Sequence, residues 1–242
     1  MPILRTWRLF LLLLVYCPGS SAAGGEIVFI APLSSAMPFA RFADGQLSAG
    51  ILKDLGDAIA GKLGREARFV SIPGKRVGQT LSAGLADGVC NVMPAWIPGD
   101  FAWSRPLIPN AGVVVSRSDA PVIRTIGDLA GLRVGTVLGY RYPSLEPVIG
   151  KLFIREDART VEQVFLKMHV GRNKHSIVER REFEYELHTN KASTLREDLV
   201  YETYKTSCAF SRASKIAFAD IDQAIAALVS AGAVDAIIAR YR

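Results

Sequence analysis

The chain has 242 residues and a net charge of +6, with 50% hydrophobic and 21% charged residues. This length allows one large domain or two smaller lobes. Basic residues are interspersed with acids throughout, as in REDARTVEQVFLK, and this mixed pattern argues against a nucleic-acid-binding protein.

Residues 1–23 have the features of a secretory signal peptide. Arg5 and Arg8 precede the apolar run LFLLLLVY, and a stretch of small residues follows, while the apolar run is too short to span a membrane. Cys17 could anchor a lipoprotein, but the bulky Tyr16 before it argues against that alternative. Removing this segment deletes two arginines and no acid, so the net charge falls from +6 to +4. No later run approaches the length of a membrane span, so we expect a soluble, exported protein.

From residue 26 to residue 94 the sequence alternates short apolar strands with amphipathic helices. Ile51, Leu55 and Ile59 are four residues apart and predict one buried helical face. Val77 and Leu81 predict a second helix in the same way. Together with strands at 26–32, 67–73 and 88–94, this β-α-β-α-β order predicts an α/β fold with a mostly parallel sheet.

The alternation of strands and helices continues after residue 110, and no long linker or internal repeat separates the two halves. Pro143 suits the first turn of a helix. We expect strands at 111–117, 132–139, 152–157, 175–181 and 204–212, and helices at 125–131, 142–151, 160–171, 182–190, 220–232 and 233–241.

Three loops follow predicted strands and are rich in aromatic residues. Ligands of open parallel sheets bind at the carboxyl ends of strands, so loops 31–39, 91–107 and 139–143 predict a binding cleft. Each aromatic residue could instead pack in the core. A cleft with aromatic walls and two arginines favours a small polar solute that is anionic or aromatic. A helix opening at 140–143 would add free N–H groups for an anion. The candidate residues in these loops are Phe39, Trp96, Trp103, Arg105, Tyr140, Arg141 and Tyr142.

Several segments, in the same order along the chain, resemble the family 3 extracellular solute-binding proteins, which have the type II periplasmic-binding fold. The resemblance covers nearly all of the chain after residue 23. It implies two α/β lobes joined by two crossing strands, with residues 24–110 and 209–242 in lobe 1 and residues 111–208 in lobe 2. The segments that carry it are MPFARFADGQLSAGILKDLGDAIAGKLG, AGLADGVCNVMPAW, AWSRPL, AGVVVSR, TIGDLAGLRVGTVLGY, and CAFSR with the terminal helices.

The resemblance also implies a function. Such proteins are periplasmic monomers that close on a small solute by a hinge motion and deliver it to a membrane ABC permease, without a cofactor. Members that bind amino acids have Thr-x-Glu-Arg after the Met, and this Arg binds the α-carboxylate. Here the corresponding PAWIPGDFA lacks both Thr and Arg, so we do not expect an ordinary α-amino acid.

Other residues could supply the missing contacts. Arg105 and Arg141 could bind an anionic group from either side of the cleft. Glu179 loosely matches the second-lobe acid that binds an amino group in this family. Trp96 and Trp103 would form a wall of the cleft, with Trp96 the stronger candidate because Trp103 matches an aromatic residue that often packs structurally.

Two cysteines remain outside the leader, Cys90 and Cys208. In an oxidising compartment they could form a disulfide, or they could stay as two buried thiols. The resemblance implies that they lie on neighbouring strands within disulfide reach, and we predict the bond.

No HExxH, CxxC, GxSxG or P-loop motif occurs, so we predict a binding protein rather than an enzyme, with no metal site. A small-acid lyase on the same fold would need a carboxylate in the cleft, and Asp100 or Glu179 is the visible candidate. A secreted sensory module that signals to a membrane receptor is the other alternative.

Overall fold

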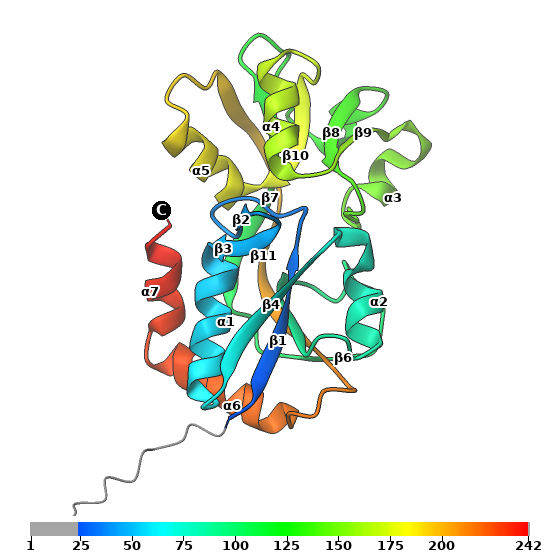
Figure 1. Cartoon of the computed structure of the whole chain (residues 1–242). Helices are drawn as coiled ribbons and strands as arrows, with labels where there is room; N and C mark the ends of the chain where they lie inside the picture. The colour runs from blue at the N-terminus through cyan, green and yellow to red at the C-terminus, as the bar shows by residue number, and fades with distance from the viewer. Residues whose placement is uncertain (1–23, 242) are drawn as a thin grey trace, which may run out of the picture.

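The computed structural model describes residues 24–241 and shows two lobes connected by two strands (Figure 1). The predicted signal peptide and Cys17 lie outside the described residues. Over residues 24–241 no single helix is long and apolar enough to cross a membrane, and α6 and α7 pass that test only as a pair bent by 67°.

Lobe 1 is built mainly from the first part of the chain and from its C-terminal end, where α7 lies beside α1 (Figure 1). Its elements are β1 (Glu26–Pro32), β2 (Arg41–Ala43), β3 (Gln46–Ala49), α1 (Ile51–Lys62), β4 (Glu66–Ile72), η1 (Gly74–Arg76), α2 (Val77–Ser82), β5 (Gly88–Val92), β6 (Phe101–Trp103), α6 (Phe218–Ser230) and α7 (Ala233–Ala239).

Lobe 2 contains the middle of the chain, and strands β7 and β11 run between the lobes (Figure 1). The elements are β7 (Ile108–Arg117), η2 (Ile126–Leu129), β8 (Arg133–Val137), α3 (Glu146–Ile149), η3 (Gly150–Leu152), β9 (Ile154–Ala158), α4 (Val161–His169), β10 (His175–Glu179), α5 (Arg180–Thr189) and β11 (Leu195–Ser211).

One sheet passes through both lobes in the order β4-β1-β5-β11-β7-β10-β8-β9, with β6 also paired to β11. Strands β7 and β11 pair antiparallel from Ile108–Thr206 to Arg117–Leu195. The lobe 1 strands join the β11 side, where β1 is parallel to β4 and β5. The lobe 2 strands join the β7 side, where β8 is parallel to β9 and β10. The predicted α/β class and the two crossing strands are thus confirmed.

Each lobe has a hydrophobic core on both faces of its part of the sheet. Alternate residues of β1 point to opposite faces, so Phe29 packs with α1, α6 and α7 while Ile30 packs with α2. The predicted stripe of α1 is confirmed, because Ile51, Leu55 and Ile59 are at most 1% exposed. Burying such a side chain contributes roughly 1.5–3 kcal/mol.

We propose lobe boundaries near residues 110 and 209. The residues that make up each core support these boundaries. The two lobe 1 clusters use buried residues up to Ile108 and from Cys208 onward. The buried residues of the two lobe 2 clusters lie between Ala111 and Leu195, apart from Ala36, which reaches across from lobe 1.

The structure differs from the sequence predictions in several places. Asp44 and Gly45 form the turn of a hairpin, β2–β3, that was not predicted, and both residues have positive φ values, of 50° and 74°. Asp-Gly is a preferred pair for such a turn. The last strand begins at Leu195, nine residues earlier than predicted, because it pairs along the whole of β7. The helix predicted from Tyr142 begins only at Glu146.

Cys90 and Cys208 form the predicted disulfide. The two residues face each other in the β5–β11 pair, with a Cα–Cα distance of 3.9 Å. Both are buried, with 5% and 0% exposure. The bond joins positions 118 residues apart and fixes the C-terminal part of β11 to lobe 1.

We expect the double variant Cys90→Ala/Cys208→Ala to be less stable than the wild type. A cross-link that closes a loop of this length lowers the entropy of the unfolded chain, and its loss costs about 4 kcal/mol. Urea unfolding of the variant and of the wild type measures the difference. The mature wild type should also show no free thiol when denatured, and one or two titratable thiols would contradict the assignment.

Candidate ligand-binding site

A cavity of about 110 Å³ lies between the lobes and is lined by both of them. Lobe 1 contributes the loop after β1, the end of β5 and the loop that follows it. Lobe 2 contributes the loop after β8, the end of β10, the first turn of α5 and part of β11. The volume is below the roughly 300–1,000 Å³ of drug-sized sites, so the cavity suits a small solute.

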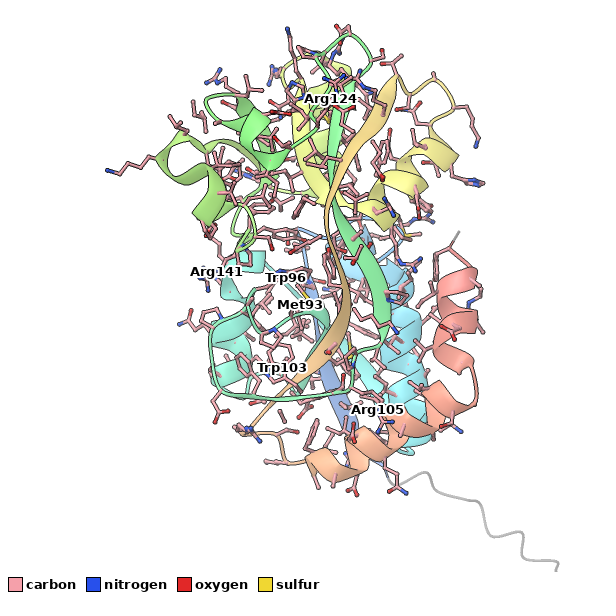
Figure 2. All side chains as sticks on the ribbon, turned by 180° about the vertical axis from the view of Figure 1, so that it is seen from behind. Met93, Trp96, Trp103, Arg105, Arg124 and Arg141 are labelled. Carbon is pink, nitrogen blue, oxygen red and sulfur yellow. A yellow bond between two sulfur atoms is a disulfide. The ribbon has the colours of Figure 1, made fainter. Side chains whose placement is uncertain are left out.

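Five of the predicted site residues line this cavity: Trp96, Tyr140, Arg141, Tyr142 and Glu179. Figure 2 shows Trp96 at the junction of the lobes, near the crossing strands, with Arg141 farther toward the outer side. Arg141 is exposed, whereas Tyr142 is 6% exposed. Contact of these residues with a ligand remains a prediction.

The other three predicted residues lie outside the cavity. Phe39 is completely buried in the core of lobe 1. Trp103 packs edge-on against Phe101, with ring centroids 6.3 Å apart. The exposed Arg105 pairs with Asp222 of α6 at 3.3 Å. Figure 2 shows Trp103 and Arg105 in lobe 1, away from the junction of the two lobes.

The pairing of β6 explains this displacement. Phe101–Trp103 runs antiparallel to the end of β11, next to Ala209–Ser211, which draws the second half of the 91–107 loop along lobe 1. Only the first half of that loop, with Trp96, stays near the end of β5. The sequence could place the loop beside the cleft, but it could not show this turn away from it.

The helix that was expected to open at residues 140–143 begins later. Tyr140–Pro143 precede α3, which has four residues and begins at Glu146. The backbone N–H of Tyr142 donates to the Glu146 carboxylate at 3.3 Å. This segment therefore offers no row of free helical N–H groups.

Aromatic rings form much of the cavity wall. Trp96 packs edge-on against Tyr204, with ring centroids 5.3 Å apart. Burial raises the pKa of Tyr140, Tyr201 and Tyr204 well above the ordinary value, so all three are neutral phenols. Tyr201 and Tyr204 were not among the predicted site residues. The expected strand 204–212 begins at Tyr204 and leaves Tyr201 outside it, whereas β11 carries both.

Glu179 ends β10 and is the centre of a hydrogen-bond network between the lobes. Its carboxylate accepts from Asn110 Nδ2 at 2.6 Å and from Asn91 Nδ2 at 3.3 Å. Asn91 has a φ of 60° and lies at an irregularity in the β5–β11 pairing. Such bulges redirect a side chain. The hydroxyl of Thr206 donates to Asn91 Oδ1 at 2.8 Å and holds the amide in place.

The cavity withdraws the Glu179 carboxyl from water, which raises its pKa to about 7 despite the hydrogen bonds from Asn91 and Asn110 and the nearby charge of Arg181. The carboxyl therefore changes charge near neutral pH. A carboxyl group with such a pKa in a cleft is typical of a functional site.

Glu182 and Glu202 are further carboxyl groups in the cavity that the sequence analysis did not select. Glu182 follows Glu179 by three residues, the spacing of neighbours on one helix face. The hydroxyl of Ser144 donates to Glu202. The Asp, Glu, Lys and Arg residues of the lining are three glutamates and a single arginine, Arg141. This balance does not support the anionic ligand that the sequence suggested.

The alternative catalytic candidate Asp100 lies outside the cavity. It is exposed and pairs with Arg212 at 3.3 Å. Among the described residues, no group of three or more His, Cys, Asp or Glu side chains is arranged to hold a metal ion.

We expect Glu179→Gln to change how stability depends on pH. Native Glu179 keeps its proton up to about pH 7, whereas an unfolded glutamate loses it near pH 4.5. The native state thus binds more protons in this window, and stability falls as the pH rises through it. The melting temperature of Glu179→Gln relative to wild type should be higher at pH 8 than at pH 5. The exposed Glu184→Gln is the control, and equal differences at both pH values would contradict the assignment.

No protein-family model and no curated protein matches the chain. Several solved structures are similar to it in fold. The arginine-, lysine-, histidine-binding protein ArtJ from Geobacillus stearothermophilus has a TM-score of 0.76 and 16% identity, over 89% of this chain and 94% of that one. An ancestral arginine-binding protein bound to arginine has a TM-score of 0.74 and 19% identity, over 91% and 99%. The GluR0 ligand-binding core with L-glutamate has a TM-score of 0.73 and 15% identity, also over 91% and 99%.

The likeness extends along nearly the full length of each of these chains. At such low identity it shows the architecture. The chain has the two-lobed fold of the type II periplasmic binding proteins, as its sequence predicted.

Proposed function

We propose that this protein is a periplasmic solute-binding protein that captures a small polar solute between its lobes and delivers it to an ABC permease. The observation that carries the proposal is a cavity lined from both lobes, with polar and aromatic side chains converging on it. A solute can contact all of these side chains only when the two lobes are close to each other. Binding therefore depends on the relative position of the lobes.

The lobes meet across the cavity through non-covalent contacts, which include the packing of Ala36 in the lobe 2 core. Asn91 donates to Glu179, and the backbone N–H of Val161 donates to the Ser34 carbonyl at 3.2 Å. Each lobe has its own cores, and the strongest physical connection is the β7–β11 pair. A bend in these two strands would open the cavity and withdraw Ala36 from the lobe 2 core, while the other buried residues of both cores stay within their own lobes.

The solute is polar and carries a group that a carboxylate can bind. Solved structures of this fold are described with bound arginine and L-glutamate, so an amino acid is one candidate class. An ordinary α-amino acid has a carboxylate that needs a cationic partner in the site. Among the lining residues the arginine is Arg141. The aromatic rings of Trp96, Tyr140 and Tyr204 suit the apolar or cationic part of a solute.

A sensory role is the second candidate, because the GluR0 ligand-binding core shares the fold. A strain that lacks this protein should lose uptake of the solute if the protein serves transport. It should retain uptake and lose a response to the solute if the protein serves signalling.

Trp96 provides the sharpest test of the binding cavity. A thermal-shift screen of amino acids, amines, organic acids and sugars identifies a solute that raises the melting temperature. We expect Trp96→Ala to weaken binding of this solute by about tenfold, since an aromatic wall contributes about 1–2 kcal/mol and 1.4 kcal/mol is a factor of ten. Calorimetric titration measures the affinity.

Trp103→Ala is the matched control, because it removes the other tryptophan of the same loop outside the cavity. It should leave the affinity of the folded protein within twofold of wild type. Equal losses in both variants, or a loss only with Trp103→Ala, would contradict the position of the site.

A further inference from the structure

The end of lobe 2 farthest from lobe 1 is built from the connections that lead into its strands (Figure 1). Strands β8, β9 and β10 run parallel, and β10 and β11 both run antiparallel to β7, so the starts of four strands lie at one end of the sheet. The cavity lies at the other end of these strands, beside the ends of β8 and β10. The connections at the outer end, which we call the lobe 2 tip, are residues 117–133, 150–154, 170–175 and 190–195.

Backbone hydrogen bonds hold the segments of the lobe 2 tip together. Each of these bonds joins two segments that are separate in the sequence, so the segments form one surface. The bonds run from the N–H groups of Arg117, Ser118 and Gly131 to the carbonyls of Lys174, Thr194 and Leu152, with N···O distances of 3.0, 2.8 and 2.9 Å.

Positive charge is concentrated at the lobe 2 tip. Its segments contain seven basic and two acidic residues, a net charge of +5, whereas the whole chain after residue 23 has a net charge of +4. Both acids are engaged within the tip. Asp119 pairs with Arg117 at 2.8 Å, and the Asp128 carboxylate accepts the backbone N–H groups of Arg124 and Thr125 at 2.8 and 3.0 Å.

Most of the basic side chains of the tip have no acidic partner. Figure 2 shows Arg124 in the upper part of lobe 2, at the opposite end of the molecule from Arg105. Five basic side chains of the tip are exposed and form no salt bridge within residues 24–241: Arg124, Lys151, Arg172, Lys174 and Lys191.

Large apolar side chains are exposed among these charges. Lys151 precedes Leu152 in the sequence, and Arg133 follows Leu132. Basic residues beside exposed apolar ones suit the surface of an anionic bilayer, where the cations meet phosphate groups and the apolar groups enter the headgroup region. The apolar side chains of the tip that are 38–61% exposed are Val122, Leu132, Leu152, Ile154 and Val170.

We propose that the lobe 2 tip binds the surface of a membrane that contains anionic phospholipids. The attachment is peripheral and leaves the cavity uncovered, because the cavity lies at the other end of the lobe 2 strands. A lipid surface fits better than an acidic protein, since the cations are dispersed over four segments and mobile headgroups can move to meet them. This inference goes beyond the proposed solute-binding function and does not depend on it.

The test is co-sedimentation of the mature protein with lipid vesicles. One set of vesicles contains phosphatidylcholine alone, and the other contains phosphatidylcholine mixed with phosphatidylglycerol. We expect binding to the anionic vesicles at low salt and little binding to the neutral ones. At about 1 M salt, where the Debye length is about 3 Å, most of the binding should be lost.

Two double variants assign the binding to the tip. Arg172→Gln/Lys174→Gln should bind the anionic vesicles at least tenfold more weakly than the wild type, because one Lys or Arg near an anionic bilayer strengthens binding by about fivefold. Lys62→Gln/Lys215→Gln is the matched control, since it removes the same charge from exposed positions of lobe 1. Its binding should stay within twofold of the wild type.

A third double variant tests the apolar contribution at constant charge. Leu152→Ser/Val170→Ser removes two exposed apolar side chains from the tip and should weaken binding to the anionic vesicles by at least threefold. Circular dichroism shows whether each variant is folded.

Three outcomes would overturn the proposal. Equal binding to neutral and anionic vesicles would exclude recognition of the anionic headgroup. Equal losses in the tip variant and the lobe 1 control would show that the overall positive charge, and not the lobe 2 tip, causes the binding. No binding to anionic vesicles even at low salt would exclude the lipid partner and favour an acidic protein surface in its place.

Discussion

Strands β7 and β11 pair antiparallel from one lobe into the other, and both halves of the sheet are built on this pair. The lobe 1 strands attach along β11 and the lobe 2 strands along β7, so the two halves lie on opposite sides of the pair. The cavity forms where the pair passes between the lobes. The hydrogen-bond network of Glu179 follows from this arrangement, because Asn110 lies on β7, Thr206 on β11, and Glu179 at the end of the strand next to β7.

The disulfide and the hydrogen bond of Asn91 lie close to the place where β11 passes between the lobes. The disulfide connects two strands of lobe 1, and the hydrogen bond connects the two lobes. Cys90 and Cys208 fix β11 to β5 inside lobe 1, just after the place where β11 enters it. Asn91, the next residue along β5, directs its amide toward Glu179 of lobe 2. The covalent bond thus stabilises one lobe, while the contacts between the lobes at this place are non-covalent.

Three glutamates line the cavity, and two of them, Glu179 and Glu182, are withdrawn from water. A carboxylate removed from water without a partner costs several kcal/mol, and proteins respond by keeping the proton. Glu179 offsets part of this cost through two asparagine donors, while one oxygen of Glu182 has no partner. Carboxyl groups with raised pKa values in a cleft are typical of functional sites.

Much of the fold could be predicted from the sequence because its signals are local. The apolar periodicity of Ile51, Leu55 and Ile59, and the alternation of β1, depend only on which residues face a core. The disulfide followed from the order of strands that the family resemblance implied. The hairpin at Asp44 and Gly45 had a local signal, the Asp-Gly pair, but no hairpin was predicted from it.

The site was predicted less well, since it depends on where loops go after they leave a strand. Trp96 and Trp103 are seven residues apart, yet the pairing of β6 with β11 brings only Trp96 to the cavity. Arg105 was expected to bind an anion and instead pairs with Asp222, a partner more than a hundred residues away in sequence. Glu182 could have been found from its three-residue spacing after Glu179, but its burial is visible only in three dimensions.

Binding of a small solute between the lobes beside Trp96 can be followed directly through the two tryptophans outside the leader. The measurement is a ¹⁵N–¹H NMR titration that follows both indole N–H signals while a stabilising solute is added. We expect a saturable shift of the Trp96 signal and little change in the Trp103 signal. A shift of Trp103 alone, or saturation binding that moves neither signal, would contradict it.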